Sequence, residues 1–332
     1  MERIALCVGL DYHQDSVQVC VLDRKGRVLA NRRCPNDGPA IARAVARHGR
    51  PVEAAIEACS GAADLAEEFG RAGWQVSLAH PGYVARMKGS PDKTDFSDAR
   101  LLADLVRVGY LPRVWLAPRE VRELRLLVRH REQLARQRRA VKLRVRALLR
   151  EQRVAPPPGL GRWSRAWVGW LGQAPLSEQG RWVMEEHLAH LGWLKERILG
   201  AERRLAALTE NDPVVARLRG LRGVGPVTAW WLRAEVGEFS RFRTGKQLAR
   251  FCGLSPRNAS SGQRQADSGL IRAGNAQLRA CLIQAAHSLI QHAPRWRRLA
   301  GKMGAAGKPR SLVTAAVANR WVRWLHHQMV AA

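Results

Sequence analysis

The chain has 332 residues, with 56 Lys and Arg against 28 Asp and Glu, which gives a formal net charge of +28. No apolar stretch approaches the ~20 residues that span a bilayer, and the first residues lack the charged, apolar and small-residue series of a signal peptide. The six cysteines, at positions 7, 20, 34, 59, 252 and 281, form no CxxC pair and lie mostly in apolar runs. We therefore expect no membrane segment, no disulfide framework and no structural zinc.

The positive charge is concentrated after residue 115. Residues 1–115 hold 16 Lys and Arg against 14 Asp and Glu, a net of +2, so the remaining 217 residues carry +26 of the +28. A basic surface binds phosphate backbones without sequence preference, because each neutralised phosphate releases counterions. A genome-wide drift toward Arg is the alternative, but it would not leave the first 115 residues nearly neutral. The distribution therefore predicts a nucleic-acid partner.

Residues 1–115 alternate strand and helix patterns. Three runs, 4–11, 16–22 and 28–32, are separated by turn residues and predict an antiparallel meander. Helix, strand, helix, strand and helix patterns follow, over residues 39–48, 52–58, 62–72, 75–79 and from 95 onward. This order is that of the ribonuclease H fold. We predict an α/β, ribonuclease-H-like (RuvC-like) domain over residues 1–115.

Four carboxylates stand where such a fold would place a metal site. Asp11 and Glu57 each close an apolar strand pattern, while Asp95 and Asp98 begin the last helix, three residues apart on one face. Clustered carboxylates select hard cations such as Mg²⁺, and two such ions about 3.5–4 Å apart clamp the attacking and leaving oxygens of a phosphodiester. The spacing predicts phosphoryl transfer on nucleic acid. Acids that merely cap turns are the alternative, which four in this order disfavour.

Residues 116–210 are predicted to form a basic helical arm. Residues 116–153 hold 13 Lys and Arg against 4 Asp and Glu, with apolar residues at helical spacing; a Pro-Pro-Pro-Gly sequence at 156–159 ends the pattern, and a second helical pattern covers 182–209. We expect an antiparallel hairpin or coiled coil that binds nucleic acid or dimerises. A structural helix with a solvated charged face is the alternative. The residues expected to contact nucleic acid are Arg136, Arg138, Arg139, Lys142, Arg144 and Arg146.

Residues 211–332 are predicted to form a third, mainly helical domain. A helix, the turn Gly223-Val224-Gly225 and a second helix make a helix-hairpin-helix-like element, and the turn amides at Gly223 and Gly225 could hold a DNA phosphate. A Gly-Leu-Ser-Pro sequence at 253–256 then leads into a polar loop that contains Ser260 and Ser261.

With these motifs in order, the chain resembles the DEDD-type insertion-sequence transposases of the insertion sequence one-ten family, which are RNA-guided serine recombinases. The resemblance covers nearly the whole chain. It departs at Gln263, where many relatives have a small residue, and is loose after residue 293. It rests on Gly-Leu-Asp at 9–11, the acid at 57, Lys-Thr-Asp-x-x-Asp-Ala-Arg at 93–100, Gly-Val-Gly at 223–225, Gly-Leu-Ser-Pro at 253–256, Ser-Gly at 261–262 and Gly-Asn-x-x-Leu-Arg at 274–279.

The resemblance implies that Asp11, Glu57, Asp95 and Asp98 hold Mg²⁺ and that Ser261 is the nucleophile, forming a covalent phosphoserine link to the cleaved strand. A serine hydroxyl needs a base or a metal to activate it, so acids and serine would act together. The family precedent is a composite site across subunits. Ser260 is the alternative nucleophile, which spacing to the following glycine disfavours.

The resemblance also implies the partners. Donor and target double-stranded DNA would be chosen by a structured noncoding guide RNA encoded in the element, the bridge RNA. The active complex would be a homo-oligomer, a dimer or a tetramer. We expect the protein to work in the cytoplasm, associated with the nucleoid.

Two other classes of protein share parts of this sequence. A RuvC-like junction-resolving nuclease would use the same four acids with water as the nucleophile and would not need Ser261. A non-enzymatic nucleic-acid-binding relic would be expected to lack at least one acid, and all four are present. The sequence therefore favours a DNA transposase or recombinase, with the nuclease as the alternative.

Overall fold

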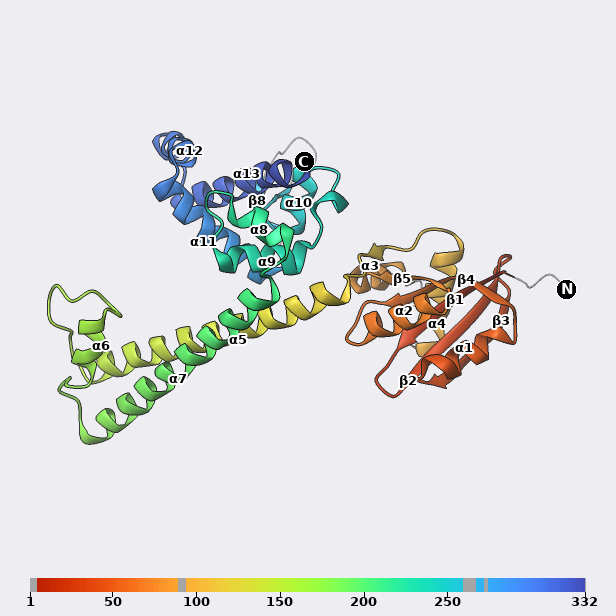
Figure 1. The fold of residues 1–332 in the computed structure, drawn as a ribbon, viewed down its shortest axis with the longest axis horizontal. Helices are drawn as coiled ribbons and strands as arrows, with labels where there is room; N and C mark the ends of the chain where they lie inside the picture. Colours follow the sequence, from red (N-terminus) through yellow and green to blue (C-terminus); the bar gives the residue numbers. More distant parts are fainter. Residues whose placement is uncertain (1–4, 89–93, 259–266, 272–273, 332) are drawn as a thin grey trace. The chain divides into compact units, whose positions relative to one another are not determined.

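The computed structural model describes residues 5–88, 94–258, 267–271 and 274–331. The chain divides into two compact units, Met1–Pro118 and Arg119–Ala332 (Figure 1). The further boundary expected at residue 210, within the second unit, stays a prediction. Among the helices of the described ranges, none has both the length and the apolar character needed to cross a membrane.

The first unit is built on a six-stranded sheet with the strand order β3-β2-β1-β4-β5-β6. The first three strands are antiparallel neighbours, β4 and β5 continue parallel to β1, and β6 is a short antiparallel edge. The strands are β1 (Ala5–Tyr12), β2 (Ser16–Asp23), β3 (Val28–Pro35), β4 (Arg50–Glu57), β5 (Gln75–Ala79) and β6 (Arg113–Val114).

Helices cover both faces of this sheet, which explains why its central strands are apolar on both sides. On β1, Leu6, Val8 and Leu10 pack in the cluster that contains residues of α1 (Gly38–Ala46) and α2 (Ala62–Arg71). The alternate residue Cys7 lies in the cluster on the opposite face, with residues of α4 (Asp95–Arg107). This alternation is the two-residue period of a strand. The mixed α/β architecture predicted for this part of the chain is confirmed.

The structure adds short elements that the sequence patterns did not indicate. A one-turn helix α3 (Pro81–Val84) and a 3₁₀ turn η1 (Ala85–Met87) lie between β5 and α4. The two-residue edge strand β6 was not predicted either; the predicted order of the other strands and helices is confirmed, with boundaries shifted by a few residues. Elements of two to four residues carry too little periodicity to be recognised.

Helix α4 approaches β1 so closely that only glycine fits at position 9. A Cβ placed on Gly9 would lie 1.9 Å from the carbonyl oxygen of Ala99 and 2.5 Å from the backbone nitrogen of Ala103. Both are backbone atoms of α4, so the contact could be relieved only by moving the helix. Because α4 carries Asp95 and Asp98, this contact sets how near those acids come to the end of β1.

We expect Gly9→Ala to lower the free energy of unfolding of the first unit by about 3 kcal/mol, the upper range for overpacking a core. The measurement is urea-induced unfolding of the full chain, followed by near-UV circular dichroism. Gly70→Ala is the matched control, since Gly70 lies in helix α2 and a Cβ there meets no atom within 4 Å. Equal stability of the two variants would contradict the close approach of α4 to β1.

In the second unit, two long helices run antiparallel. They are α5 (Arg119–Glu151) and α7 (Glu178–Leu208). At one end, Gln152 donates a hydrogen bond to Ser177 (2.9 Å), and farther along, Arg131 donates to Glu202 (2.7 Å). The predicted helical hairpin is therefore present, and Figure 1 shows the two helices side by side. Helix α6 (Arg165–Leu171), which was not predicted, packs where α5 and α7 are connected, with Trp167 buried at its centre.

The rest of the second unit is a mainly helical body, as predicted. Trp231 and Trp321 lie fully buried in its core. The N-terminal part of α5 is held to this body by Glu235, which accepts hydrogen bonds from Arg129 at 2.9 and 3.2 Å. The elements of the body are α8 (Pro213–Arg219), α9 (Pro226–Val236), η2 (Phe239–Arg241), α10 (Gly245–Phe251), β7 (Pro256–Asn258), β8 (Asp267–Leu270), α11 (Ala276–His292), α12 (Pro294–Ala305) and α13 (Arg310–Val330).

Candidate metal centre and nucleic-acid interface

Asp11 and Glu57 lie at the same edge of the sheet. Strands β1 and β4 are parallel neighbours, with Leu10 of β1 opposite Ile56 of β4. Each acid follows one residue later, where the carboxyl ends of parallel strands meet and where open sheets place their sites. The charges of both acids also act on the thiol of Cys59, whose pKa is raised by burial first and then by Glu57 and Asp11. The two predicted acids therefore share one neighbourhood.

The first turn of α4 brings two more acids to this edge. Thr94 caps the helix by accepting a hydrogen bond from the Ser97 amide (3.2 Å), and Ser97 completes a capping box. Asp95 and Asp98 follow in the first turn, where the helix dipole favours negative charge. Asn31 of β3 donates to the carbonyl oxygen of Phe96 (3.0 Å), tying this turn to the sheet.

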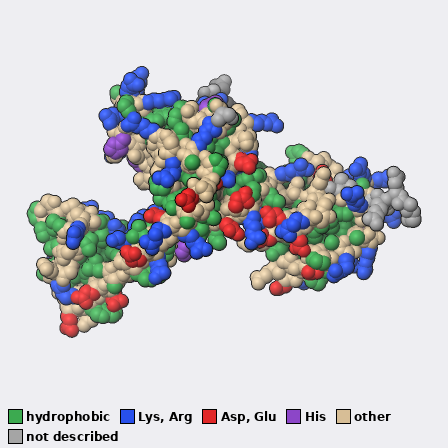
Figure 2. All heavy atoms as spheres, viewed as in Figure 1, with side chains coloured by type: hydrophobic (Ala, Val, Ile, Leu, Met, Phe, Trp, Pro, Cys, Tyr) green, Lys and Arg blue, Asp and Glu red, His purple; other side chains and the backbone are tan. Residues whose placement is uncertain are grey.

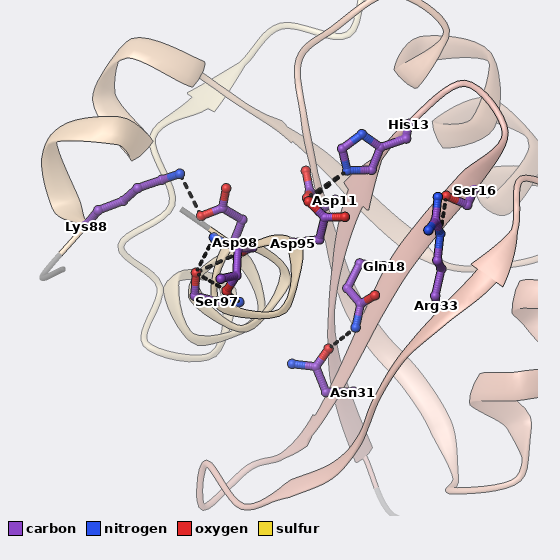
Figure 3. A network of polar contacts seen from close by, with 11 residues as sticks. Asp11, His13, Ser16, Gln18, Asn31, Arg33, Lys88, Asp95, Ser97 and Asp98 are labelled. Atoms are coloured by element: carbon purple, nitrogen blue, oxygen red, sulfur yellow. Dashed lines mark hydrogen bonds and ion pairs between the residues drawn. The ribbon is translucent and has the colours of Figure 1, made fainter. Parts of the chain in front are cut away.

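Asp98 is a buried carboxylate with a lysine partner. Its relative exposure is 5%, and the ammonium of Lys88 lies 2.6 Å from its Oδ1. A buried charge is costly unless it is paired, so the contact with Lys88 offsets the cost of burying this carboxylate and fixes its position. Figure 3 shows Lys88 and Asp98 joined in this way.

The pKa of the Asp11 carboxyl is raised above its ordinary value by burial, and the other acids contribute to the rise. Burial is the largest cause that raises the pKa of its carboxyl; His13 opposes the rise by its charge and a hydrogen bond, and the charges of Asp98 and Asp95 add to it. Like charges raise the pKa of a carboxyl only when they are near. His13 contacts Asp11 and Asp95 at 3.2 and 3.3 Å, and Asp98 lies in the same helical turn as Asp95 (Figure 3), so these three acids lie together, with Glu57 at the neighbouring strand end.

Sequence reasoning missed two residues at this site, His13 and Lys88. The Nε2 atom of His13 lies 3.2 Å from Asp11 Oδ2 and 3.3 Å from Asp95 Oδ1 (Figure 3). Residue 13 is two positions after Asp11, and the strand period of two would have placed both side chains on one side. Lys88 had no such signal, since it joins the site only through the path of the chain after α3.

The donor set fits a divalent cation. One ligand atom each from Asp11, His13 and Asp95 lies within 4.8 Å of the others. Carboxylate oxygens suit Mg²⁺ and Mn²⁺, and an imidazole nitrogen is a common additional ligand for transition metals. Asp11, His13 and Asp95 are therefore suitable ligands for the divalent metal ion that the clustered acids imply.

The predicted nucleophile, Ser261, and its alternative, Ser260, lie outside the described residues. The chain on either side of them is described: β7 and β8 are antiparallel, with Asn258 opposite Asp267. The assignment of the nucleophile stays a prediction.

The basic residues predicted to contact nucleic acid all lie on α5 but differ in their exposure to solvent. Arg136, Arg139, Arg144 and Arg146 are exposed, whereas Arg138 and Lys142 are partly buried. Lys142 lies over the ring of Trp163, 4.4 Å from its centroid, and burial lowers the pKa of its ammonium. Figure 2 shows Lys and Arg side chains spread along the hairpin. The exposed arginines are therefore better placed than Lys142 to meet a phosphate.

The turn predicted as helix-hairpin-helix-like joins α8 to α9. Gly223 has a φ of +89°, a left-handed conformation that favours glycine, and a Cβ there would lie 2.4 Å from Leu289 Cδ2. Gly225 is the N-cap residue of α9, and a Cβ on it would meet no atom within 4 Å. Gly223 is thus required by the fold, while Gly225 leaves space at the helix N-terminus.

Comparisons with known proteins place both units in one family. Residues 8–153 match the model of the DEDD transposases of IS110 elements, described as "Transposase", and residues 215–300 match "Transposase IS116/IS110/IS902 family". A "Probable family 20 transposase" of Pseudomonas aeruginosa is 30% identical over 330 residues, covering 96% of this chain and 95% of that protein. The chain belongs to the IS110 family of transposases.

Other members of the family align over most of the chain. The "Transposase for insertion sequence element IS1111A" of Coxiella burnetii is 28% identical, covering 86% of this chain and 78% of the relative. That of element IS1328 from Yersinia enterocolitica is 26% identical, covering 86% and 84%. The resemblance inferred from the motifs is confirmed, and with it the identification of a DNA-processing enzyme of a mobile element.

Proposed function

We propose that this transposase cleaves and exchanges DNA strands in a divalent-metal-dependent reaction that passes through a covalent phosphoserine intermediate. The observation that carries the proposal is that Asp11 and Asp95 both lie within 3.3 Å of His13 Nε2 at the carboxyl end of β1, with Asp98 in the same helical turn as Asp95 and Glu57 at the end of the neighbouring strand. The sheet order, three antiparallel strands followed by parallel ones, supports a ribonuclease-H-like assignment for this unit.

In this proposal Asp11, Glu57, Asp95 and Asp98 hold Mg²⁺. When bound, the metal would neutralise charge on the scissile phosphate and favour the ionised form of the attacking hydroxyl. The protein residues keep the acids in place. Lys88 pairs with Asp98 in its buried position, and the capping box at Thr94 orients the first turn of α4. The ligands are thus fixed before substrate arrives, which lowers the reorganisation needed for reaction.

Ser261 would then attack phosphorus. Its Oγ loses a proton and forms one P–O bond, one P–O bond of the DNA breaks, and the departing DNA hydroxyl takes up a proton. The number of phosphate ester bonds is unchanged, so reversal with a different DNA hydroxyl reseals the strand without ATP. Ser260 remains the alternative nucleophile.

The charge of the second unit supports the nucleic-acid partners in this proposal. Residues after 115 carry +26 of the net charge, and the exposed arginines of α5 would bind phosphates of DNA or of the guide RNA. We propose that a bridge RNA encoded in the element selects donor and target DNA, that Gly223 and Gly225 lie at a phosphate contact, and that the active complex is a homo-oligomer. The enzyme would act in the cytoplasm on nucleoid DNA.

The experiment that tests the proposal is the trapping of a protein–DNA adduct. End-labelled donor DNA is incubated with the full chain, the guide RNA and Mg²⁺, stopped with detergent, and examined on a denaturing gel. Label that migrates with the protein and disappears after protease treatment is expected. Cleaved DNA without any adduct would replace the recombinase with the junction-resolving nuclease, which uses water.

We expect charge reversal on α5 to weaken nucleic-acid binding. The triple change Arg136→Glu, Arg144→Glu and Arg146→Glu should lower affinity by about tenfold or more and reduce the slope of log K against log salt by about two to three, because each phosphate contact contributes about 0.9. The measurement is fluorescence anisotropy with labelled RNA and DNA from 50 to 200 mM salt, a range over which such slopes are large.

The matched control makes the same change in net charge on the nearly neutral first unit. Arg24, Arg43 and Arg47 are exposed there, and their replacement by Glu should leave the salt slope close to that of the wild type. If the α5 variant and this control behave alike, the basic face of α5 is structural and its assigned partner is wrong.

A further inference from the structure

One imidazole nitrogen faces two carboxylates at the candidate metal centre. Asp11 lies on β1 and His13 just after its end, while Asp95 lies in the first turn of α4, so the three side chains come from two parts of the fold. The Nε2 atom of His13 is 3.2 Å from Asp11 Oδ2 and 3.3 Å from Asp95 Oδ1. Figure 3 shows the ring beside both acids.

This arrangement is poorly explained as a hydrogen bond alone. A ring nitrogen carries one proton or one lone pair, so Nε2 can satisfy only one carboxylate in a linear hydrogen bond. Nε2 makes its hydrogen bond with Asp11 Oδ2 at 3.2 Å, yet Asp95 Oδ1 lies only 0.1 Å farther away, so one hydrogen bond does not account for both contacts. A cation placed among the three atoms would satisfy both carboxylates and the nitrogen lone pair at once.

The exposure of the three side chains agrees with a metal position that substrate can reach. The His13 and Asp95 side chains are 45% and 50% exposed, while that of Asp11 is 15% exposed. Asp98 differs, because it is buried and already paired with Lys88. Asp11 and Asp95 therefore form a partly exposed group with His13, whereas Asp98 is a buried carboxylate paired with the ammonium of Lys88.

We infer that His13 is a protein ligand of the divalent ion held by Asp11 and Asp95, and that this mixed nitrogen and oxygen position takes a first-row transition ion such as Mn²⁺ more tightly than Mg²⁺. The inference rests on the proposed function, which assigns the acids to metal binding. Mg²⁺ is bound almost entirely through oxygen, whereas transition ions also accept imidazole. The four acids identified by motif would alone form an all-oxygen site, in which this preference would be weaker.

Pulsed electron paramagnetic resonance on the Mn²⁺-loaded full chain tests the ligand directly, without any measurement of activity. With ¹⁵N-labelled histidine, the wild type should show the coupling of a directly bound imidazole nitrogen. His13→Ala should lose that coupling, while His48→Ala, a partly buried histidine just after α1, should keep it. Thermal melts followed by circular dichroism check that both variants fold.

Calorimetric titration gives the second readout. His13→Ala should weaken Mn²⁺ binding by about tenfold or more, the scale for losing a group that supports a metal, and should weaken Mg²⁺ binding much less. Nitrogen coupling that survives in His13→Ala, or Mn²⁺ affinity that is unchanged or higher, would overturn the inference.

Asp11→Asn separates this failure from failure of the proposed function. If Asp11→Asn loses Mn²⁺ while His13→Ala does not, the acids hold metal and only the role of His13 is wrong. If the wild-type chain binds neither Mn²⁺ nor Mg²⁺, both the inference and the metal-dependent mechanism are wrong.

Discussion

Ser261→Ala should abolish both the covalent protein–DNA adduct and every recombinant product, while the protein still assembles with guide RNA and DNA. Alanine removes the only atom of that side chain able to attack phosphorus, and a covalent route cannot proceed without its nucleophile. The measurement combines adduct trapping with sequencing of recombination junctions. Gel-shift assays on the same preparations report assembly.

Ser260→Ala is the matched control and should keep most activity, because adjacent residues rarely present both side chains to one point. Ser261→Cys should retain at most a trace, since a thiolate attacks but its larger sulfur fits poorly. Mass spectrometry of the protease-digested adduct places the phosphate on one serine. A phosphate on Ser260 would transfer the role to the neighbour.

Asp98→Asn should reduce recombination by about 10³-fold, comparable to the loss of a major electrostatic contribution in other active sites. An amide cannot supply the negative charge that a divalent ion requires. Recombination between donor and target plasmids with the guide RNA is the measurement. Near-normal recombination would remove Asp98 from the metal site.

Stability should change in opposite directions at Asp11 and Asp98. Asp98 is paired with the partly buried Lys88 at 2.6 Å, so Asp98→Asn leaves that ammonium without its counter-charge and should lower the free energy of unfolding. Asp11 has its pKa raised, chiefly by burial, so its ionised form is disfavoured in the folded chain and Asp11→Asn should raise the free energy of unfolding at pH 7 when metal is chelated.

The gain from Asp11→Asn should depend on pH. A carboxyl whose pKa is raised on folding costs no stability below its unfolded pKa of about 3.9, and the cost develops as pH rises from there through the folded pKa. Urea unfolding with EDTA, from pH 3 to pH 7, should therefore show the two proteins converging at the acidic end. A gain that is the same at every pH would contradict burial as its cause.

Much of the first unit could be predicted because its strands and helices are long enough to show a period. The β1–β3 meander and helices α1, α2 and α4 repeat apolar residues over eight positions or more. Helix α3, strand β6 and helix α6 are too short for such a pattern. The four acids were found because each stands at an element boundary, where the pattern itself changes.

The other site residues depend on three-dimensional packing that spacing does not encode. Lys88 reaches Asp98 only because α3 and η1 turn the chain back toward α4, and neither was predicted. His13 lies beside Asp95, eighty-two positions later in the chain, because α4 packs on β1. Sequence alone also missed why residue 9 is glycine: its Gly-Leu-Asp motif suggested chemistry, and the structure gives a steric cause.

That steric cause limits how this transposase could be re-engineered. A Cβ on Gly9 would meet the backbone of Ala99 and Ala103, and both alanines are fully buried, so each position accepts very few side chains whatever the DNA substrate. A library that randomises the acidic edge together with these three positions would consist mostly of misfolded members. Variation confined to exposed positions, such as Phe96, which is 52% exposed, would keep α4 packed on β1 and the acids in place. Selection could then act on DNA specificity.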